Sequence, residues 1–325
     1  MPDPRVCIVG AGRLSSRRIY PYIGAAGGQL VGVCDLDREK AEQNARRFGG
    51  AVYDDLEAML AEQRPDGVII CVGPHGHAEL APRVLRLGYP VYTEKPPAPT
   101  AAEALAVARV ARETGLLCMT AFKKRYSTAW QRAKEWLAKF PESEWHSASV
   151  DYASGPYRNE DARTAFLLDF AIHVIDAIGY LMGDARRVFA FTRDHHAYVV
   201  SIEFANGALG ALNLTDGRSF GVPTEELELT VQGGNFLTMS NSSRWRITEG
   251  QRPCEWREPQ TFISGGDSGN DTGHLAEIVE FLAAIQEGRS TRSEIYASYK
   301  SMVLYEAIRD SADTGRVIEI AYETL

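Results

Sequence analysis

The first part of the chain alternates short, wholly apolar runs with longer amphipathic segments. Uniformly apolar runs are typical of parallel strands covered on both faces, and here they are residues 5–9, 30–34, 67–72, 91–93 and 117–121. Apolar positions at helical spacing between them predict helices at 14–24, 38–48, 55–62, 78–87 and 101–114. Because crossovers between parallel strands are right-handed, this order predicts a doubly wound parallel sheet.

The pattern changes after residue 122. A helix is expected at 128–140, with Trp130, Trp136 and Leu137 as its apolar positions. Alternating polar and apolar residues then predict strands with one buried face, at 145–152, 188–192, 198–204, 208–215, 226–232, 236–240 and 243–248. Helices at 273–287 and 294–310 and an apolar run at 316–321 follow. We therefore predict two domains, an α/β domain at 1–122 and an α+β domain with a large, mainly antiparallel sheet at 123–325.

A glycine turn follows the first predicted strand. Gly10, Ala11 and Gly12 lie between this strand and a predicted helix, an arrangement that brings backbone N–H groups against a phosphate. Gly10 would allow the tight turn, and Gly12 would let a pyrophosphate approach, because a Cβ there would collide with it. Ser15 stands where the third glycine of the G-x-G-x-x-G pattern is expected. The alternative is an ordinary strand–turn–helix unit.

Asp35 ends the second predicted strand, about twenty residues beyond the glycines. A carboxylate at this position accepts both hydroxyls of an adenine ribose and repels a 2′-phosphate, which favours NAD over NADP. Arg38 favours the opposite choice, because an arginine just past the strand can bind that phosphate. The structural alternative for Asp35 is a cap or turn ahead of the helix at 38–48.

The third predicted strand leads into Gly73, Pro74 and His77. This segment lies at the carboxyl end of the sheet, where folds of this kind bind their ligands. His77 therefore either contacts a cofactor or substrate or caps the helix that begins at residue 78.

Lys95 follows the fourth predicted strand, between Glu94 and two prolines. Pro96 and Pro97 stiffen the turn and permit a cis bond between Lys95 and Pro96. A lysine held in this way beside a cofactor can stabilise a developing alkoxide or donate a proton. The alternative is a solvated surface lysine.

Asp169 and His173 lie four residues apart in an apolar segment with helical spacing, so their side chains share one helix face. A carboxylate beside an imidazole selects its tautomer and raises its basicity, as a general acid–base pair requires. The alternative is a histidine satisfied at a contact of the helix. Only Asp176 could add a nearby metal ligand, so we expect no metal.

Composition narrows the class of protein further. With 325 residues, 45% of them hydrophobic and 24% charged, the chain resembles an ordinary globular protein. A formal net charge of −8 argues against general binding to nucleic acid or an anionic membrane, and no apolar run is long enough to span a bilayer. We expect no signal peptide, because a strand begins almost at the first residue. The cysteines form no C-x-x-C pair, which suits a cytoplasmic protein without a zinc site; they are Cys7, Cys34, Cys71, Cys118 and Cys254.

Three motifs together resemble the Gfo/Idh/MocA family of NAD(P)-dependent sugar and cyclitol oxidoreductases. They are Val9-Gly10-Ala11-Gly12, Glu94-Lys95-Pro96, and Asp169 with His173, and their order fits across essentially the whole chain. Glu277 and Phe281 also match the family's late G-x-x-x-E-x-x-x-F stretch. The resemblance implies a Rossmann dinucleotide-binding domain, followed by a substrate-binding and oligomerisation domain with an open-faced sheet. Ser15 and the glycine-free segment 163–168 depart from the family's pattern.

The resemblance also implies an activity and roles for these residues. Hydride would move between nicotinamide and a secondary hydroxyl of a sugar, sugar derivative or cyclitol, with His173 as acid/base, Asp169 orienting it and Lys95 stabilising the oxygen. The residues expected to face NAD, or NADP in its place, are Gly10, Ala11, Gly12, Arg13, Leu14, Asp35, Arg38, Gly73, Pro74, His77, Glu94, Lys95 and Pro96. Lys95, Asp169 and His173 would also face the substrate. Position in the chain adds Arg125 and Tyr126 after the fifth predicted strand, Tyr157 and Arg158 in the loop before the helix of Asp169, and His274 as a further candidate; for each of these the alternative is a surface loop residue or a helix cap.

Two other functions remain open beside net dehydrogenation. Transient oxidation at C3 would acidify the C2–H bond, so that elimination and re-reduction cleave a glycoside without net change in NAD. A cofactor-binding sensor would keep the fold without turnover, although it would not need Lys95, Asp169 and His173 together. In each case we expect a small-molecule ligand and a homodimer or homotetramer formed through the C-terminal sheet. Which sugar is bound, and which carbon is oxidised, stays open.

Overall fold

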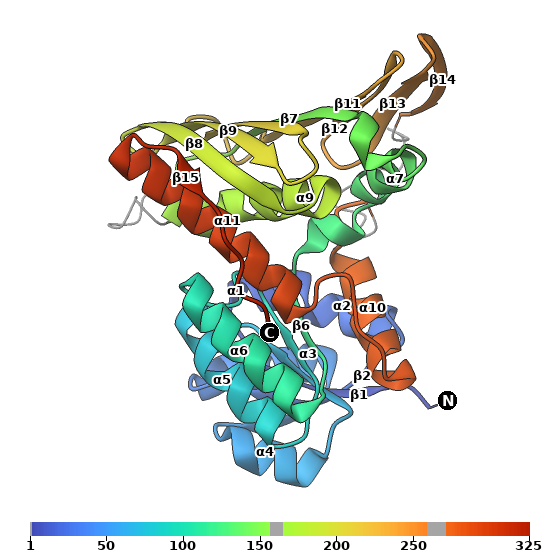
Figure 1. The fold of residues 1–325 in the computed structure, drawn as a ribbon. Coiled ribbons are helices and arrows are strands. Elements are labelled where there is room, and N and C mark those ends of the chain that lie inside the picture. The colour runs from blue at the N-terminus through green and yellow to red at the C-terminus, as the bar shows by residue number, and fades with distance from the viewer. Residues whose placement is uncertain (1, 157–164, 259–270) are drawn as a thin grey trace. The chain divides into compact units, whose positions relative to one another are not determined.

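The computed structural model describes residues 2–156, 165–258 and 271–325. The chain forms two compact units (Figure 1). Unit 1 comprises Met1–Lys123, His274–Tyr299 and Leu325, and unit 2 comprises Lys124–Gly273 and Lys300–Thr324. The change of unit after Lys123 lies one residue from the predicted domain boundary. Residues 274–299, however, pack with unit 1 and not with the second domain to which the sequence pattern assigned them.

Unit 1 contains a six-stranded sheet in the order β3-β2-β1-β4-β5-β6, and all its pairings are parallel. The strands are β1 (Arg5–Val9), β2 (Gln29–Cys34), β3 (Ala51–Tyr53), β4 (Gly67–Ile70), β5 (Val91–Thr93) and β6 (Cys118–Thr120). This is the predicted doubly wound sheet with one strand more. The sequence pattern missed β3 because it is a three-residue edge strand with no buried residue.

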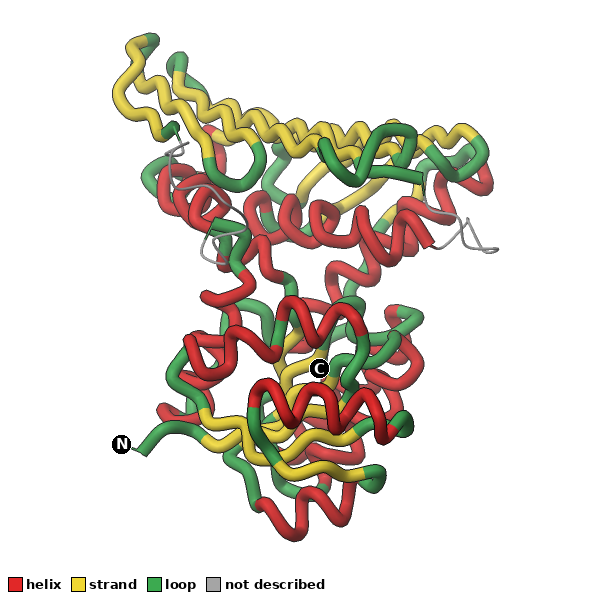
Figure 2. Tube along the Cα trace, turned by 180° about the vertical axis from the view of Figure 1, so that it is seen from behind, coloured by secondary structure: helices red, strands yellow, loops and turns green. Residues whose placement is uncertain are grey.

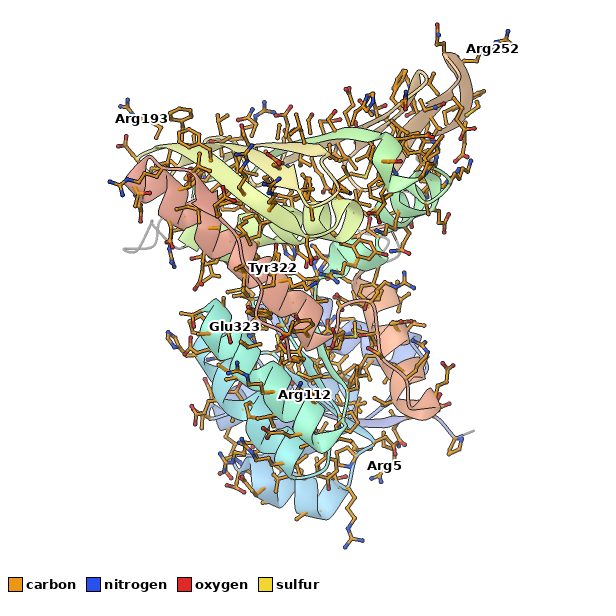
Figure 3. The ribbon with its side chains drawn as sticks, in the orientation of Figure 1. Arg5, Arg112, Arg193, Arg252, Tyr322 and Glu323 are labelled. Carbon is orange, nitrogen blue, oxygen red and sulfur yellow. The ribbon has the colours of Figure 1, made fainter. Side chains whose placement is uncertain are left out.

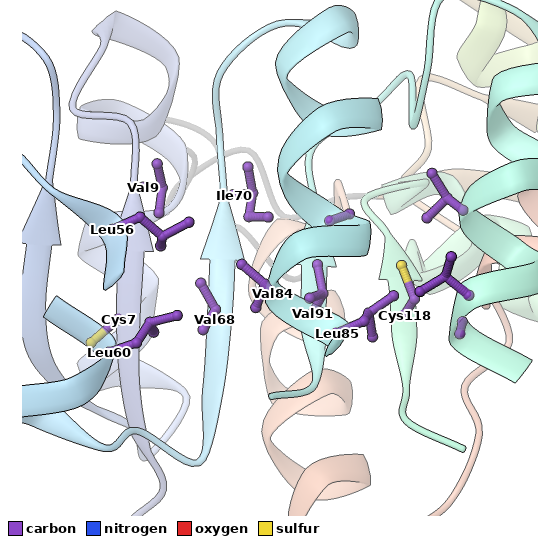
Figure 4. Close-up of a cluster of buried hydrophobic side chains, with 14 of the residues drawn as sticks. Cys7, Val9, Leu56, Leu60, Val68, Ile70, Val84, Leu85, Val91 and Cys118 are labelled. Atoms are coloured by element: carbon purple, nitrogen blue, oxygen red, sulfur yellow. The ribbon is translucent and has the colours of Figure 1, made fainter. Parts of the chain in front are cut away.

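Helices cover both faces of this sheet. On one face, apolar residues of α4 (Leu56–Gln63), α5 (Pro74–Arg86) and α6 (Ala101–Thr114) form a buried cluster with the strands, as Figure 4 shows. The opposite face packs against α2 (Tyr20–Ala25) and α10 (His274–Glu287). Phe281 of α10 lies edge-on against Tyr92 of β5, with ring centroids 5.6 Å apart. Residues 274–299 therefore belong to unit 1 because α10 supplies part of its core.

Local capping explains which helix boundaries the sequence predicted well. The predicted ranges 38–48 and 101–114 agree with α3 (Arg38–Phe48) and α6. Asp37 caps α3 and Thr100 caps α6, each by accepting the backbone N–H of the residue three positions later. The predicted helix at 14–24 is instead two short helices, α1 (Arg13–Arg18) and α2, interrupted at Ile19. Pro21 lies in the first turn of α2, where its missing N–H group is tolerated.

Unit 2 contains a nine-stranded sheet in the order β14-β13-β12-β11-β7-β10-β9-β8-β15. Its pairings are antiparallel except for β10 with β7. The strands are β7 (Trp145–Ala153), β8 (Ala185–Arg193), β9 (Ala197–Phe204), β10 (Leu209–Thr215), β11 (Thr224–Val231), β12 (Asn235–Ser240), β13 (Arg244–Glu249), β14 (Arg252–Arg257) and β15 (Ile318–Glu319). The sequence pattern missed β14, whose residues are mostly exposed.

The described helices of unit 2 all lie on one face of this sheet, as Figures 1 and 2 both show. They are α7 (Thr128–Leu137), α9 (Ile172–Met182) and the later part of α11 (Ile295–Thr314), with short 3₁₀ turns η1 (Lys123–Tyr126) and η2 (Glu142–Glu144). The other face of the sheet carries exposed side chains. Arg193 and Arg252 lie toward opposite ends of the sheet (Figure 3). The predicted α+β domain with a mainly antiparallel, open-faced sheet is thus confirmed.

Candidate active site

The glycine turn after β1 has the geometry that a phosphate-binding turn requires. Gly10 has φ +105°, and a Cβ on it would lie 2.0 Å from the carbonyl oxygen of Cys71, so only glycine fits. Gly12 is different, because nothing lies within 4 Å of the position a Cβ would take. The space above Gly12 is therefore open on the side where a pyrophosphate would approach.

Side chains that the sequence analysis did not single out hold this turn. The Tyr20 hydroxyl donates to the carbonyl oxygen of Gly10 at 3.3 Å, and the Asn44 amide donates to that of Ala11 at 3.3 Å. Ser15 is fully buried, and its hydroxyl donates to the carbonyl oxygen of Gly12 at 3.0 Å. The serine that replaces the third glycine is therefore accommodated. A polar residue such as Asn44 on the buried side of a helix was the signal available in the sequence.

Asp35 lies directly after β2 and contacts the glycine turn. Its carboxylate accepts the Ala11 N–H at 2.6 Å and the Asp37 N–H at 2.8 Å. Asp37, and not Asp35, caps α3. The other half of the structural alternative is borne out, because the contact with the Asp37 N–H makes Asp35 a turn residue ahead of this helix. A carboxylate has about four acceptor positions, and two of these remain for ribose hydroxyls. Leu36 beside it is 97% exposed, which leaves an apolar surface next to this carboxylate.

Arg38 follows Asp35 and is exposed, but two carboxylates compete for its charge. Its Nε lies 3.2 Å from Glu42, and one of its terminal nitrogens lies 4.0 Å from Asp54. At the first turn of α1, Arg13 and Leu14 are both exposed, as expected of residues that face a ligand. Their contact with a cofactor stays a prediction.

His77 is buried in the first turn of α5 and lies between two backbone groups. Its Nδ1 is 2.8 Å from the carbonyl oxygen of Pro96, and its Nε2 is 3.3 Å from the backbone nitrogen of Val72. Because a carbonyl only accepts, the proton lies on Nδ1, and Nε2 accepts from Val72. Burial lowers the pKa of His77 to about 4, although the Pro96 contact opposes this shift. His77 therefore ties the end of β4 to the Pro96 turn as a neutral imidazole.

The position of His77 excludes one of the two functions expected for it and leaves the other open. The helix begins at Pro74, with Gly73 as its N-terminal cap, so His77 does not cap a helix starting at residue 78. No atom lies within 4 Å of a Cβ placed on Gly73, which leaves space above the backbone there as at Gly12. A direct contact of Gly73, Pro74 or His77 with a cofactor remains a prediction.

The Glu94–Pro96 turn holds Lys95 at the carboxyl end of β5. The Lys95–Pro96 bond is cis, as the sequence allowed. The carboxylate of the buried Glu94 accepts the backbone N–H of Lys95 at 3.0 Å. With the His77 contact to Pro96, side chains therefore hold the backbone on both sides of the Lys95 carbonyl. Lys95 itself is partly exposed, so this lysine is not simply a solvated surface residue.

Asp169 and His173 lie where a π-helical turn, η3 (Ala165–Ala171), passes into α9. The sequence predicted an ordinary helix here. Turns of π-helix are rare and occur frequently at functional sites. Asp169 is exposed, whereas His173 is only 8% exposed and its Nδ1 is shielded from solvent. The orienting contact between Asp169 and His173 stays a prediction.

Aromatic stacking holds η3 against the sheet of unit 2. Phe170 stacks on Tyr152 of β7 with ring centroids 4.5 Å apart, and it also stacks on Phe166 at 6.1 Å. Phe166 in turn stacks on Tyr198 of β9 at 6.4 Å. Because Phe170 directly follows Asp169, this stack sets where the Asp169 backbone lies.

Arg125 has a structural contact that the sequence analysis did not foresee. Its guanidinium makes a two-pronged, buried ion pair with Asp176, with Nη2 to Oδ1 at 2.7 Å and Nε to Oδ2 at 3.0 Å. Asp176 also accepts from the Ser301 hydroxyl at 2.6 Å. Asp176 is one turn beyond His173, so this pair anchors the helix that carries the histidine.

The remaining candidate substrate residues are distributed as follows. Tyr126 is buried in η1, and His274 is buried in unit 1 with its Nε2 3.4 Å from the Lys123 ammonium nitrogen. Tyr157 and Arg158 lie outside the described residues. For these residues a substrate contact stays a prediction.

The candidate residues thus fall into two groups. The glycine turn, Asp35, Gly73 and Lys95 lie at the carboxyl ends of β1, β2, β4 and β5 in unit 1. Asp169 and His173 belong to unit 2. Within residues 2–156, 165–258 and 271–325, no three His, Cys, Asp or Glu side chains gather as metal ligands would. In the same ranges, no helix combines the length and apolar character needed to cross a membrane.

Comparison with known proteins identifies the class to which this fold and these motifs belong. A model of the Gfo/Idh/MocA oxidoreductase family, described by its NAD-binding Rossmann fold, matches residues 4–122. The model of that family's C-terminal alpha/beta domain matches residues 157–320. The chain belongs to this family, as the three motifs predicted, and it is an NAD(P)-dependent oxidoreductase.

Among curated relatives, the D-glucoside 3-dehydrogenase of Escherichia coli (strain K12) is 30% identical, over 97% of this chain and 97% of the relative. The scyllo-inositol 2-dehydrogenase (NAD(+)) of Bacillus subtilis (strain 168) is 26% identical, over 72% of this chain and 73% of the relative. The structure of a levoglucosan dehydrogenase in complex with NADH and L-sorbose has a TM-score of 0.86 at 20% identity. That comparison covers 99% of this chain and 100% of the other, and it supports the fold.

Proposed function

We propose that this protein transfers hydride between NAD and a secondary hydroxyl of a sugar or sugar derivative. His173 would act as acid/base, with Lys95 and Asp169 assisting. The observation that carries the proposal is the Glu94–Pro96 turn, in which Glu94 and His77 hold the backbone around a partly exposed Lys95. This turn ends a strand of a domain that belongs to an NAD-binding family.

Each side chain has a distinct task in this reaction. The glycine turn and Asp35 would hold NAD, which would supply the acceptor for the hydride of the carbinol carbon. His173 takes the hydroxyl proton on Nε2, since its Nδ1 is shielded from solvent. The Lys95 ammonium donates a hydrogen bond to the substrate oxygen while negative charge develops there. Asp169 orients the imidazole and stabilises its protonated form.

NAD is the cofactor we propose in preference to NADP. Asp35 carries a negative charge at the position expected for the adenine ribose, and it would repel a 2′-phosphate. Glu42 and Asp54 already partly neutralise Arg38, the cation that could favour NADP.

Two glycine variants test where the cofactor lies. Gly12→Ala should fold normally, because its Cβ meets no protein atom, but it should weaken NAD binding by roughly tenfold or more through collision with the pyrophosphate. Gly10→Ala should lower the free energy of unfolding by at least about 2 kcal/mol, because of its positive φ and the clash with Cys71. Calorimetric titration with NAD and NADP, beside thermal unfolding, separates the two effects. Unchanged NAD affinity in Gly12→Ala would contradict this placement.

The substrate we propose to test first is a glucoside oxidised at C3. The support is the 30% identity with the Escherichia coli enzyme named D-glucoside 3-dehydrogenase. The assay follows NADH absorbance with methyl D-glucoside, then with monosaccharides, sugar acids and inositols. Lys95→Ala and His173→Asn should each lower kcat by about 10²- to 10⁴-fold. Lys40→Ala, an exposed lysine of unit 1, should not change it.

The same assay separates the alternatives. If Lys95 and His173 act on one substrate oxygen, the double variant should lose little more activity than either single variant. Release of a coloured aglycone without net NADH would favour redox-neutral cleavage, which begins with the same C3 oxidation. No turnover of any compound despite tight NAD binding would contradict dehydrogenation of these substrates and favour a sensor.

We also propose a homodimer or homotetramer formed through the exposed face of the nine-stranded sheet. Large apolar side chains on this sheet are exposed, among them Phe191, Val199, Leu209 and Trp256. Sedimentation velocity of the wild type and of Val199→Glu tests this, and a monomeric wild type would contradict it. All five cysteines are free and four are buried, which supports the proposal of a reducing cytoplasmic location.

A further inference from the structure

Glu277 of α10 is a carboxylic residue buried in the apolar core of unit 1. It is 1% exposed, and its neighbours on the same helix, Ile278 and Phe281, are completely buried. Phe281, one turn later, packs against the ring of Tyr92, which places Glu277 against the sheet near β5. A carboxyl group in such surroundings requires a specific reason, since desolvating a charge is costly.

The oxygens of Glu277 and Tyr92 lie together without an ordinary partner. Both carboxyl oxygens of Glu277 and the Tyr92 hydroxyl are shielded from solvent, and none makes a hydrogen bond of ordinary geometry to a residue that the structure describes. The Tyr92 hydroxyl is nevertheless close enough to Glu277 to influence its pKa.

This pair of side chains is directly linked to the turn that carries Lys95. Tyr92 is two residues before Glu94 on the same strand end, and the Glu94 carboxylate accepts the Lys95 N–H. Glu94 also acts electrostatically on both Glu277 and Tyr92. The buried carboxyl groups of Glu94 and Glu277 thus lie in the same part of unit 1, next to the turn that carries Lys95.

Electrostatics decides which of the two carries the proton. Two buried carboxylates so near each other cannot both ionise at low cost. Glu94 has a backbone N–H donor that favours its charged form, whereas Glu277 has no such donor among the described residues. Burial first, and the Glu94 charge second, raise the pKa of Glu277 well above its usual range. Tyr92 and Lys123 lower the pKa of Glu277, but their effects are smaller. Cys71 also faces this group and raises the pKa of Tyr92.

We propose that Glu277 is a neutral carboxylic acid that hydrogen-bonds with Tyr92. Glu94 is then the one charged carboxylate of the pair, next to the turn that carries Lys95. Glu277 is then a positioning residue, because it acts through Glu94 and the turn and touches no reacting atom. Its effect on turnover rests on the proposed catalytic role of Lys95, whereas its protonation does not.

The protonation is tested by stability alone. A group whose folded pKa is raised keeps its proton when the unfolded chain loses it, so wild-type stability falls as pH rises from about 4.5 toward the folded pKa. Glu277→Gln cannot lose a proton. The ratio of its folding equilibrium constant to that of the wild type should therefore increase as pH rises above about 5, by up to roughly tenfold per pH unit, until the folded pKa is reached. Glu287→Gln, a half-exposed glutamate of the same helix, should show no such increase. A constant ratio for Glu277→Gln would overturn the proposal.

The positioning role is tested by turnover of methyl D-glucoside with NAD. Glu277→Gln preserves hydrogen bonding and should keep kcat within about threefold of the wild type, whereas Glu277→Leu should lower kcat by roughly ten- to a hundredfold. Tyr92→Phe tests the same contact if the leucine variant fails to fold, and it should lower kcat in the same direction. Equal kcat in wild type, Glu277→Gln and Tyr92→Phe would overturn the positioning role. An active Lys95→Ala enzyme would instead reject the proposed function and leave the stability result intact.

Discussion

The two sheets of this protein differ in how many of their faces are covered. In β4 of the six-stranded parallel sheet, every residue is buried, because helices pack on both sides. In β9 and β10 of the nine-stranded sheet, buried and exposed residues alternate, because helices pack on one side only. The first sheet thus leaves only its edges and strand ends for function, whereas the second also offers a whole face.

The largest difference we expect is between ion pairs on the two sides of the nine-stranded sheet. Asp176→Asn should lower the free energy of unfolding by about 3–5 kcal/mol, because the Arg125 guanidinium would be left buried without its charge partner. Glu203→Gln weakens partly exposed pairings with Arg186 and Arg187 and should cost less than about 1 kcal/mol. Urea unfolding of both variants measures this. Equal losses of unfolding free energy in the two variants would mean that the ion pair on the covered face is no better shielded from water than the pair on the open face.

Two leucines of β10 test the same contrast with apolar side chains. Leu212 is 1% exposed and Leu209 is 57% exposed. Leu212→Ala should cost about 2–5 kcal/mol, through lost burial and a cavity. Leu209→Ala should cost less than about 0.5 kcal/mol in the monomer, as surface substitutions generally do. If Leu209→Ala costs as much as Leu212→Ala, a partner covers the open face under the conditions of measurement.

His77 gives unit 1 a pH dependence that can be assigned to one residue. Its pKa is lowered to about 4 in the folded state from an ordinary value of 6.5. Between these values the unfolded chain binds a proton and the folded chain does not, so stability falls as pH falls through this window. The loss should total about 3 kcal/mol below pH 4, relative to pH 7. His77→Gln should lack this part of the slope in urea unfolding at several pH values, and parallel slopes would contradict the assignment.

The smallest contrast we predict is between the two faces of the parallel sheet. Ile69 and Ile70 are successive residues of β4, so they point to opposite faces, and both are completely buried. Ile69→Val and Ile70→Val should each cost about 0.5–1.5 kcal/mol. Thermal unfolding of the two variants checks this. A large cost for one and none for the other would show that the parallel sheet, too, has one dominant face.

Much of the fold could be predicted from the sequence, because helix caps, glycines and prolines specify the local backbone that the structure shows. The range of α6 follows from the Thr100 cap, the Glu103 partner of that cap and Gly115 beyond the helix. The glycine turn and the cis bond before Pro96 were likewise visible as residue types that permit unusual backbone geometry. Short, exposed strands such as β3 and β14 lack the apolar pattern on which strand prediction rests, and they were missed.

The candidate site could be predicted less well, because the contacts that support it join residues far apart in the sequence. Neither Tyr20 nor Asn44 carries a motif, yet both hold the glycine turn. Arg125 was predicted as a substrate residue, and only the structure shows its buried ion pair with Asp176, 51 residues along the chain. The π-helical turn at Asp169 packs on the sheet through the Tyr152–Phe170 stack, which joins β7 to η3 and has no local pattern.

The sequence by itself determined the two kinds of sheet, the NAD-binding class and the residues at the ends of the parallel strands. These follow from periodicity, glycine geometry and short motifs, all of which act over neighbouring residues. Only the tertiary structure decided that α10 belongs to unit 1 and that Glu277 is buried beside Tyr92. It also decided that His77 is locked as a neutral imidazole. The physical reason is that burial and charge depend on which distant side chains come together, and a linear pattern does not specify those partners.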